Sequence, residues 1–217
     1  VKSLISMKFI VPLFTISVGV EALWKTQWFQ QPIDHSWNVG SFQQRYLVDD
    51  DLKAHHHEGP ILFFCGNEGD IEVFANFSGF LREAAVALRA RVVFAEHRFY
   101  GQSLPFGPDF NAYQAQYLTV EQALEDYAQL IQFLVPAPQR VHRPVVVFGG
   151  SYGGMLSSWM RAKYPDLVFA AVASSSPLHF DGVKAFFQLV TDAADAVSDG
   201  CSARVRRGFA AVLKQSR

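Results

Sequence analysis

The chain has 217 residues, a length that fits one large domain, or one domain with a piece missing. Half of the residues are hydrophobic and 18% are charged, which is typical of a globular protein and excludes a disordered chain. The 19 Lys and Arg residues nearly balance the 20 Asp and Glu residues, so the basic excess that attracts nucleic acid is absent. Two cysteines are too few for a disulfide scaffold or a four-cysteine zinc site.

An apolar run near the start of the chain has the features of a secretory signal. Residues 9–20 are largely apolar and follow Met7 and Lys8, but the run is too short to span a bilayer, which takes about 20 residues. Val20 and Ala22 stand at the two positions that a signal peptidase reads. We therefore predict a signal peptide over residues 7–22 and no stable membrane span. The alternative is a buried strand or helix of the domain.

Residues 76–78 read Asn-Phe-Ser, which is an acceptor pattern for N-glycosylation. Glycosylation of Asn76 would fit the secretory route, although such triplets also arise by chance.

From residue 41 onward, strand-like and helix-like stretches alternate. Apolar runs predict strands over residues 42–48, 60–65, 91–95, 144–148 and 167–173, the last four buried on both faces. Apolar residues at helical spacing predict helices over residues 80–90, 119–134 and 152–163. Thr119, with Gln122 three residues later, forms a capping box at the start of the second of these helices. A polar loop is expected over 49–59 and a long loop over 97–118.

The pattern changes after residue 177. Residues 183–197 and 203–213 both have helical spacing, and no further β-rich run follows. Strands that alternate with helices predict an α/β fold with a mostly parallel sheet and helices on both of its faces.

A glycine-rich motif stands between the Val-rich strand and the helix that follows it. Residues 149–154 read Gly-Gly-Ser-Tyr-Gly-Gly, the Gly-x-Ser-x-Gly pattern of a nucleophile elbow. The turn is so tight that side chains two positions before and after the serine would collide, and Gly149 and Gly153 remove that collision. We predict that Ser151 is a nucleophile and that the backbone N–H of Tyr152 is an oxyanion donor. The alternative is a plain glycine-rich turn or a phosphate-binding turn, but the dinucleotide and P-loop spacings are absent.

The loop after the strand at 60–65 is the expected source of a second oxyanion donor. Residues 66–69 read Gly-Asn-Glu-Gly, and the two glycines allow the backbone to approach a ligand closely. The N–H of Gly66 or Asn67 is the candidate donor, and Glu68 is a candidate to bind a substrate amine. A plain turn is the alternative.

Several longer motifs carry a resemblance to a known family. They are Gly-Asn-Glu-Gly-Asp at 66–70, Phe-Ala-Glu-His-Arg-Phe-Tyr-Gly at 94–101, Ser-Leu-Pro-Phe-Gly at 103–107, Thr-Val-Glu-Gln-Ala-Leu at 119–124 and Gly-Gly-Ser-Tyr-Gly-Gly-Met-Leu at 149–156. In this order they resemble the prolyl-specific serine exopeptidases, a family of Pro-X carboxypeptidases, dipeptidyl-peptidases II and thymus-specific serine proteases. The likeness covers about residues 28–177. The motif at 66–70 and Gly153 favour the first two groups, and residues 75–80 lean toward dipeptidyl-peptidase II.

The resemblance implies an α/β-hydrolase fold, of which residues 28–177 would be the N-terminal part. Residues 178–217 would begin a helical cap domain, so the fold is expected in truncated form. The implied activity is cleavage of small peptides next to proline, with Ser151 at the position of the nucleophile. No cofactor or metal is implied, a lysosomal or secreted location is expected, and a homodimer is a candidate assembly.

The remaining members of a catalytic triad have no counterpart in the chain. A serine needs a histidine to take its proton and a carboxylate to orient that histidine, and in α/β-hydrolases both follow the serine in sequence. His179 is the only histidine after Ser151, and it stands where the cap should begin. The triad Asp and His are therefore not expected in this chain, and the 217-residue chain alone is expected to be inactive.

The other histidines and the cysteines have simpler interpretations. His97 is expected to be structural and near the site, His142 to lie on the surface, and residues 55–57 to be a solvated loop rather than a metal site. Cys65 is expected to be a small buried apolar residue. Cys201 resembles a cap cysteine whose usual partner does not follow in this sequence.

The preferred function is a serine-type exopeptidase of small peptides with proline next to the cleaved bond, without nucleic acid as a partner. An esterase or lipase of the same fold, and a non-catalytic remnant that binds peptides or a partner, are the alternatives.

Overall fold

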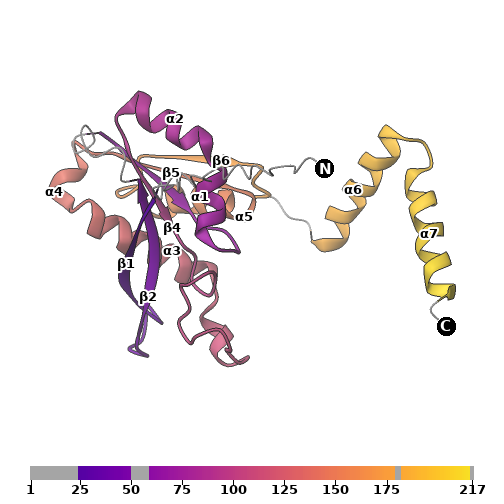
Figure 1. Ribbon diagram of the computed structural model, residues 1–217, viewed down its shortest axis with the longest axis horizontal. Helices are drawn as coiled ribbons and strands as arrows, with labels where there is room; N and C mark the ends of the chain where they lie inside the picture. Colours follow the sequence, from indigo (N-terminus) through magenta and orange to yellow (C-terminus); the bar gives the residue numbers. More distant parts are fainter. Residues whose placement is uncertain (1–23, 50–58, 179–181, 216–217) are drawn as a thin grey trace, which may run out of the picture.

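The computed structural model describes residues 24–49, 59–178 and 182–215 (Figure 1). The predicted signal peptide at 7–22, the histidines at 55–57 and His179 therefore lie outside the described residues.

One six-stranded sheet forms the centre of the fold, with the strand order β1-β2-β4-β3-β5-β6. Its strands are β1 (Trp24–Pro32), β2 (Ser41–Asp49), β3 (Ile61–Cys65), β4 (Arg91–Ala95), β5 (Val145–Gly150) and β6 (Ala170–Ser174). The pairs β3–β4, β3–β5 and β5–β6 are parallel, whereas β1–β2 and β2–β4 are antiparallel. The predicted mostly parallel sheet is confirmed.

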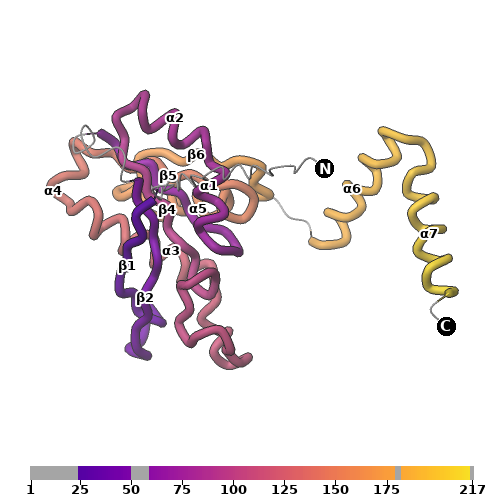
Figure 2. Tube along the Cα trace, in the orientation of Figure 1, coloured from indigo at the N-terminus to yellow at the C-terminus, as the bar shows by residue number. Residues whose placement is uncertain are grey.

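Helices cover both faces of this sheet, as the sequence predicted. Leu124, Tyr127 and Leu156, from α3 (Val120–Leu134) and α5 (Ser151–Lys163), join one buried cluster. Ile71 and Leu81, from α1 (Ile71–Phe77) and α2 (Gly79–Leu88), join a second cluster against the opposite face. Figure 2 traces the path of these helices around the sheet. A 3₁₀ turn (Gln114–Tyr117) and the short α4 (Ala137–Arg140) complete this part of the chain.

The central parallel strands owe their place to continuous apolar runs. All five residues of β3 are buried, and so are four of the five residues of β4. The Thr119 hydroxyl accepts a hydrogen bond from the Gln122 N–H at 3.3 Å, which confirms the N-cap of α3. The reciprocal half of the predicted capping box is not formed, because the Gln122 Oε1 accepts from the His35 N–H at 3.0 Å instead.

Four elements were absent from the sequence-based prediction: β1, α1, the 3₁₀ turn and α4. β1 is rich in glutamine, and its buried Gln31 donates through Nε2 to Gln44 Oε1 (2.8 Å) and to the Asp126 carbonyl (2.7 Å), whereas its Oε1 has no hydrogen-bond partner among the described residues. Hydropathy does not mark such a strand, because its buried amide group is held by polar partners rather than replaced by an apolar side chain. α1 is a short helix capped by Asp70, which accepts from the Glu72 N–H.

The predicted buried strand at 167–173 is corrected. The strand is β6, it starts at Ala170, and its residues are half-buried or exposed. Within the described residues β6 pairs only with β5, so one of its edges is unpaired. The buried apolar residue of this segment, Val168, precedes the strand.

The C-terminal helices are α6 (Val183–Val197) and α7 (Cys201–Gln215), where the sequence predicted them. They contact each other and lie away from the sheet (Figure 1). Neither helix contributes a buried residue in the described structure.

Candidate active site

Ser151 stands at a strand-to-helix turn whose backbone geometry is unusual. β5 ends at Gly150 and α5 begins at Ser151, which has a φ of 54°. This left-handed conformation costs a non-glycine residue on the order of 1–3 kcal/mol, and such strain is concentrated at functional sites. The turn places the Ser151 side chain at the carboxyl end of β5, where it is exposed.

Two glycines make this turn sterically feasible. A Cβ atom on Gly149 would overlap the carbonyl oxygen of Gly153. A Cβ atom on Gly153 would overlap Asn67 Oδ1 and lie 2.7 Å from the Cys65 carbonyl oxygen. The steric requirement for glycine at both positions, predicted from the spacing, is present in the structure.

The Ser151 hydroxyl is open to a ligand. It lies at a cavity of about 520 Å³ whose lining is largely aromatic or aliphatic, and includes Phe64, Phe74, Phe148 and Val172. Among the described residues, no histidine nitrogen lies within hydrogen-bonding distance of the Ser151 hydroxyl.

The backbone at the start of α5 can stabilise negative charge. The first N–H groups of a helix have no partner within it, and the helix dipole adds partial positive charge there. The Tyr152 N–H, one residue after Ser151, belongs to this first turn.

The loop after β3 contains the other candidate donors, and the structure separates them. The Gly66 N–H donates to the Ala95 carbonyl at 3.0 Å, and the Gly66 carbonyl accepts from the Tyr127 hydroxyl at 3.0 Å. The Gly66 N–H is therefore occupied, which corrects its candidacy as an oxyanion donor. Asn67 is the candidate that remains.

Asn67 also contacts the turn at Ser151 through its side chain. Its Nδ2 donates to the Gly150 carbonyl at 2.8 Å, and the residue is 93% buried. From the sequence, only the backbone N–H of Asn67 was predicted to act at the site. The requirement for glycine at position 153 was the signal for a close neighbour, but only the fold shows that the neighbour is Asn67.

Glu68 is exposed next to these groups. Burial, and secondarily the Glu68 carboxylate, raises the pKa of Tyr100 and raises the pKa of Tyr152 to about 12. Both phenols therefore remain protonated near neutral pH.

His97 is buried and holds the Tyr152 side chain. Its Nδ1 lies 2.7 Å from the Arg98 carbonyl, which can only accept, so Nδ1 carries the proton. Its Nε2, 3.0 Å from the Tyr152 hydroxyl, then accepts from it. Burial lowers the pKa of His97, which favours this neutral form. His97 thus lies near the site, as the sequence predicted.

Two buried ionic networks hold the loop that follows β4. The Arg98 guanidinium donates to Asp126 Oδ1 and Oδ2 at 2.6 and 2.7 Å, and His35 Nε2 lies 2.7 Å from Asp126 Oδ1. In the second network Arg45 pairs with Glu96, whose carboxylate also accepts from Ser103. Neither network was predicted, although charged residues directly after a buried strand were a signal for them.

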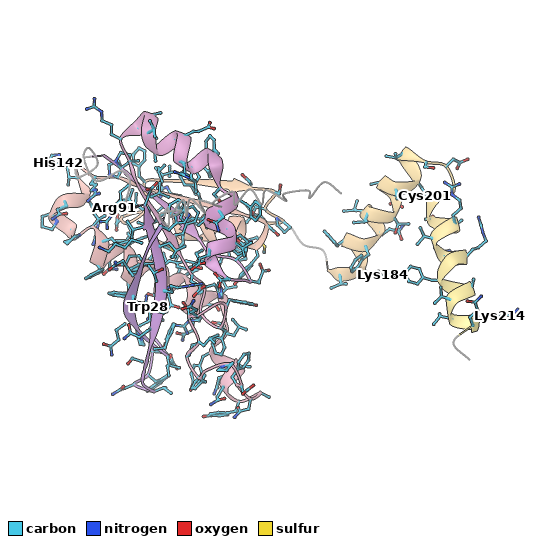
Figure 3. All side chains as sticks on the ribbon, in the orientation of Figure 1. Trp28, Arg91, His142, Lys184, Cys201 and Lys214 are labelled. Atoms are coloured by element: carbon cyan, nitrogen blue, oxygen red, sulfur yellow. The ribbon has the colours of Figure 1, made fainter. Side chains whose placement is uncertain are left out.

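The remaining residues singled out from the sequence lie in the core or at the periphery. Cys65 is fully buried, and burial raises the pKa of its thiol to about 12. His142 is exposed at the periphery, and Cys201 lies at the start of α7, away from the sheet (Figure 3). Asn76 is exposed in α1.

The described part of the chain contains neither a membrane-spanning helix nor a cluster of metal-binding side chains. It contains no helix that is long and apolar enough to cross a membrane. The same residues contain no group of three or more His, Cys, Asp or Glu side chains that could hold a metal ion.

Comparison with solved structures shows the fold. The chain aligns with Rv0554 from Mycobacterium tuberculosis at a TM-score of 0.53 and 19% identity, over 78% of this chain and 53% of that one. It aligns with a thioesterase domain from the curacin biosynthetic pathway at a TM-score of 0.52 and 17% identity, over 77% and 50% of the two chains. With the observed sheet and helices, this likeness confirms the predicted α/β-hydrolase fold.

Comparison of sequences shows the family. The chain is 43% identical to the lysosomal Pro-X carboxypeptidases of Bos taurus and Homo sapiens, over 86% and 87% of its length. It is 38% identical to the thymus-specific serine protease of Mus musculus over 77% of its length. The chain covers only 39%, 40% and 33% of these three relatives. The family model described as "Serine carboxypeptidase S28" matches residues 31–217, and the chain belongs to this family.

Proposed function

We propose that this chain supplies the nucleophile and the oxyanion hole of a serine-type exopeptidase that cleaves small peptides next to proline. The observation that carries the proposal is Ser151, which is exposed at φ 54° on a turn that only glycines at 149 and 153 allow. Membership of the S28 family supports peptide bonds as its target.

The proposed reaction is acyl transfer. Ser151 Oγ attacks the peptide carbonyl, and its proton passes to a histidine base and then to the leaving amine. The carbonyl oxygen becomes an oxyanion that the N–H groups of Tyr152 and Asn67 stabilise. Water then hydrolyses the acyl-enzyme and regenerates the serine.

The base and the acid of this reaction are proposed to come from a longer protein. The described residues bring no histidine to the Ser151 hydroxyl, and the relatives are more than twice as long as the region they share with this chain. We propose that the 217-residue chain has no turnover by itself.

Substrate recognition is proposed from the relatives' names and from one carboxylate. The Pro-X carboxypeptidases are named for cleavage after proline, and we extend that preference to this chain. Glu68, exposed beside Tyr100 and Tyr152, is proposed to attract a positively charged group of the peptide.

The cellular setting is proposed on the same basis. The lysosomal relatives, the exposed Asn76 acceptor and the candidate signal at 7–22 support the secretory pathway and the lysosome. We also propose that residues 28–177 are the N-terminal part of the hydrolase domain and that residues 178–217 begin a helical cap. Homodimer formation likewise remains a prediction.

The test uses the full-length protein with peptides and an ester. Hydrolysis of peptides with proline before the C-terminal residue, of peptides with proline second from the N-terminus, and of a nitrophenyl ester is compared. Ser151→Ala should abolish turnover of the preferred peptide, whereas Ser158→Ala, on the same helix, should not. Turnover of the ester alone would support an esterase, and full activity of the Ser151→Ala variant would contradict the proposal.

Glu68→Gln tests the recognition role separately. The expected result is a higher KM for peptides that carry a positive charge near the cleaved bond, with little change in kcat. An unchanged KM and unchanged substrate preference would remove Glu68 from the proposal.

A further inference from the structure

The Asn67 side chain connects the two segments that form the proposed oxyanion hole. Asn67 belongs to the loop after β3, and Gly150 directly precedes Ser151 at the end of β5. The amide Nδ2 donates to the Gly150 carbonyl at 2.8 Å, and the residue is 93% buried. The bond is part-buried, and both of its residues line the cavity at Ser151.

The position of this bond matters because of the backbone next to it. The Gly150 carbonyl belongs to the peptide group that precedes the N–Cα bond of Ser151. Rotation about that bond is the φ angle, which is 54° in Ser151. The Asn67 amide therefore holds the peptide plane on one side of the strained torsion that positions the serine.

The amide oxygen of Asn67, Oδ1, is positioned by steric contact and not by a hydrogen bond. Asn67 Oδ1 is buried and has no hydrogen-bond partner among the described residues. It faces Gly153, where any Cβ atom would overlap it. A buried acceptor without a partner is unfavourable for stability and calls for another explanation. Here the side chain fits between Gly150 and Gly153, on both sides of Ser151.

We propose that Asn67 is a positioning residue whose side-chain amide sets the arrangement of the two oxyanion donors, the backbone N–H groups of Asn67 and Tyr152. The inference rests on the proposed function. Because the donors act on the oxyanion and not on the bound peptide, loss of the amide should affect the transition state more than substrate binding.

The experiment compares Asn67→Ala and Asn67→Asp in the full-length protein, with Asn38→Ala as the control at an exposed asparagine. Active sites are titrated with a fluorophosphonate, so that unfolded protein does not count. For Asn67→Ala we expect kcat per site to fall by about 10- to 100-fold, since direct loss of an oxyanion donor costs about 100- to 1,000-fold. KM should stay within about twofold.

Two further measurements separate positioning from general damage. Affinity for a peptide boronic acid, which forms a tetrahedral adduct on the serine, should fall with kcat, while affinity for the product peptide should not change. The Asn67→Asp variant should recover activity relative to wild type as the pH falls, because a protonated carboxyl group can again donate to the Gly150 carbonyl.

An unchanged kcat per site in Asn67→Ala, or an equal loss of boronic acid and product affinity, would overturn the inference. If Asn67→Ala does not fold, Asn67→Ser takes its place, since serine is also too short to reach Gly150. Wild-type protein without turnover, or an active Ser151→Ala variant, would overturn the proposed function and this inference with it. A fully active Asn67→Ala beside an inactive Ser151→Ala would overturn this inference alone.

Discussion

The turn at Ser151 has a backbone conformation that few residues other than glycine adopt. Ser151 has a positive φ, and the glycines at 149 and 153 have no room for even a methyl group. The constraint comes from backbone atoms and from the Asn67 side chain, so small movements of flexible side chains cannot relieve it. The turn should therefore be intolerant of substitution even where no catalytic atom is changed.

Gly149→Ala tests this constraint. The new methyl group would overlap the Gly153 carbonyl, so we expect a loss of about 2–3 kcal/mol in the free energy of unfolding. Gly79→Ala is the matched control, because nothing lies within 4 Å of its Cβ position at the start of α2, and it should change stability by less than about 1 kcal/mol. Thermal unfolding of both variants measures the difference. Equal midpoints would show that the turn relaxes.

His97 makes the stability of the folded state depend on pH. Burial lowers its pKa in the folded state below the value of about 6.5 expected in the unfolded chain. The folded state then binds fewer protons than the unfolded state between these two values, so stability rises with pH across that window. The contribution is complete above the unfolded value and is lost as the pH falls through the folded value.

His97→Asn should remove this dependence. The asparagine amide can still donate to the Arg98 carbonyl, but it carries no titratable proton. We expect wild type to lose more thermal stability than the variant between pH 7 and pH 5. Parallel unfolding midpoints across that range would contradict a buried neutral His97.

A buried ion pair connects α3 to the loop after β4. Arg98 and Asp126 are both fully buried, and the two bonds between them measure 2.6 and 2.7 Å. His35, before β2, completes the contact at 2.7 Å from the same carboxylate. The loop that carries His97 is therefore attached to a helix on one side and to the β1–β2 connection on the other.

Asp126→Asn should be strongly destabilising. It leaves the Arg98 charge buried without its partner, which costs about 3–5 kcal/mol. Lys163→Met is the control, because it removes an exposed ion pair between Lys163 of α5 and Glu125, which lies next to Asp126 on α3. This substitution should cost at most about 1 kcal/mol. Denaturant unfolding of the two variants gives the comparison. A cost below about 1 kcal/mol for Asp126→Asn would mean that water reaches Arg98.

In the part of the chain that the structure describes, no base lies against Ser151 at the edge of the sheet. Ser151 is exposed, β6 has an edge that pairs with no other described strand, and α6 and α7 lie away from the sheet (Figure 1). An unactivated serine hydroxyl is a weak nucleophile, because it keeps its proton.

Labelling with a fluorophosphonate probe measures that activation. We expect the 217-residue chain to react slowly and the full-length protein to react fast and stoichiometrically at Ser151. Ser151→Ala in the full-length protein is the control for the site of labelling. Fast stoichiometric labelling of the 217-residue chain would contradict the proposed missing base.

The central sheet and the serine turn follow from local patterns in the sequence. The strands at 61–65 and 91–95 are continuous apolar runs, and the Gly-x-Ser-x-Gly spacing follows from sterics within a few residues, so local pattern suffices for both. β1 and the exposure of β6 did not follow, because paired glutamines and an unpaired strand edge depend on partners elsewhere in the chain.

The arrangement of the site depends on contacts between segments that are far apart in the sequence. Gly66 was excluded as a donor by the Ala95 carbonyl, and Asn67 was connected to Gly150 across a sequence separation of 83 residues. Such contacts form when β3, β4 and β5 come side by side in the sheet. Local residue patterns do not predict that pairing. They describe residues that are adjacent along the chain, whereas these hydrogen bonds join residues that are adjacent only in space.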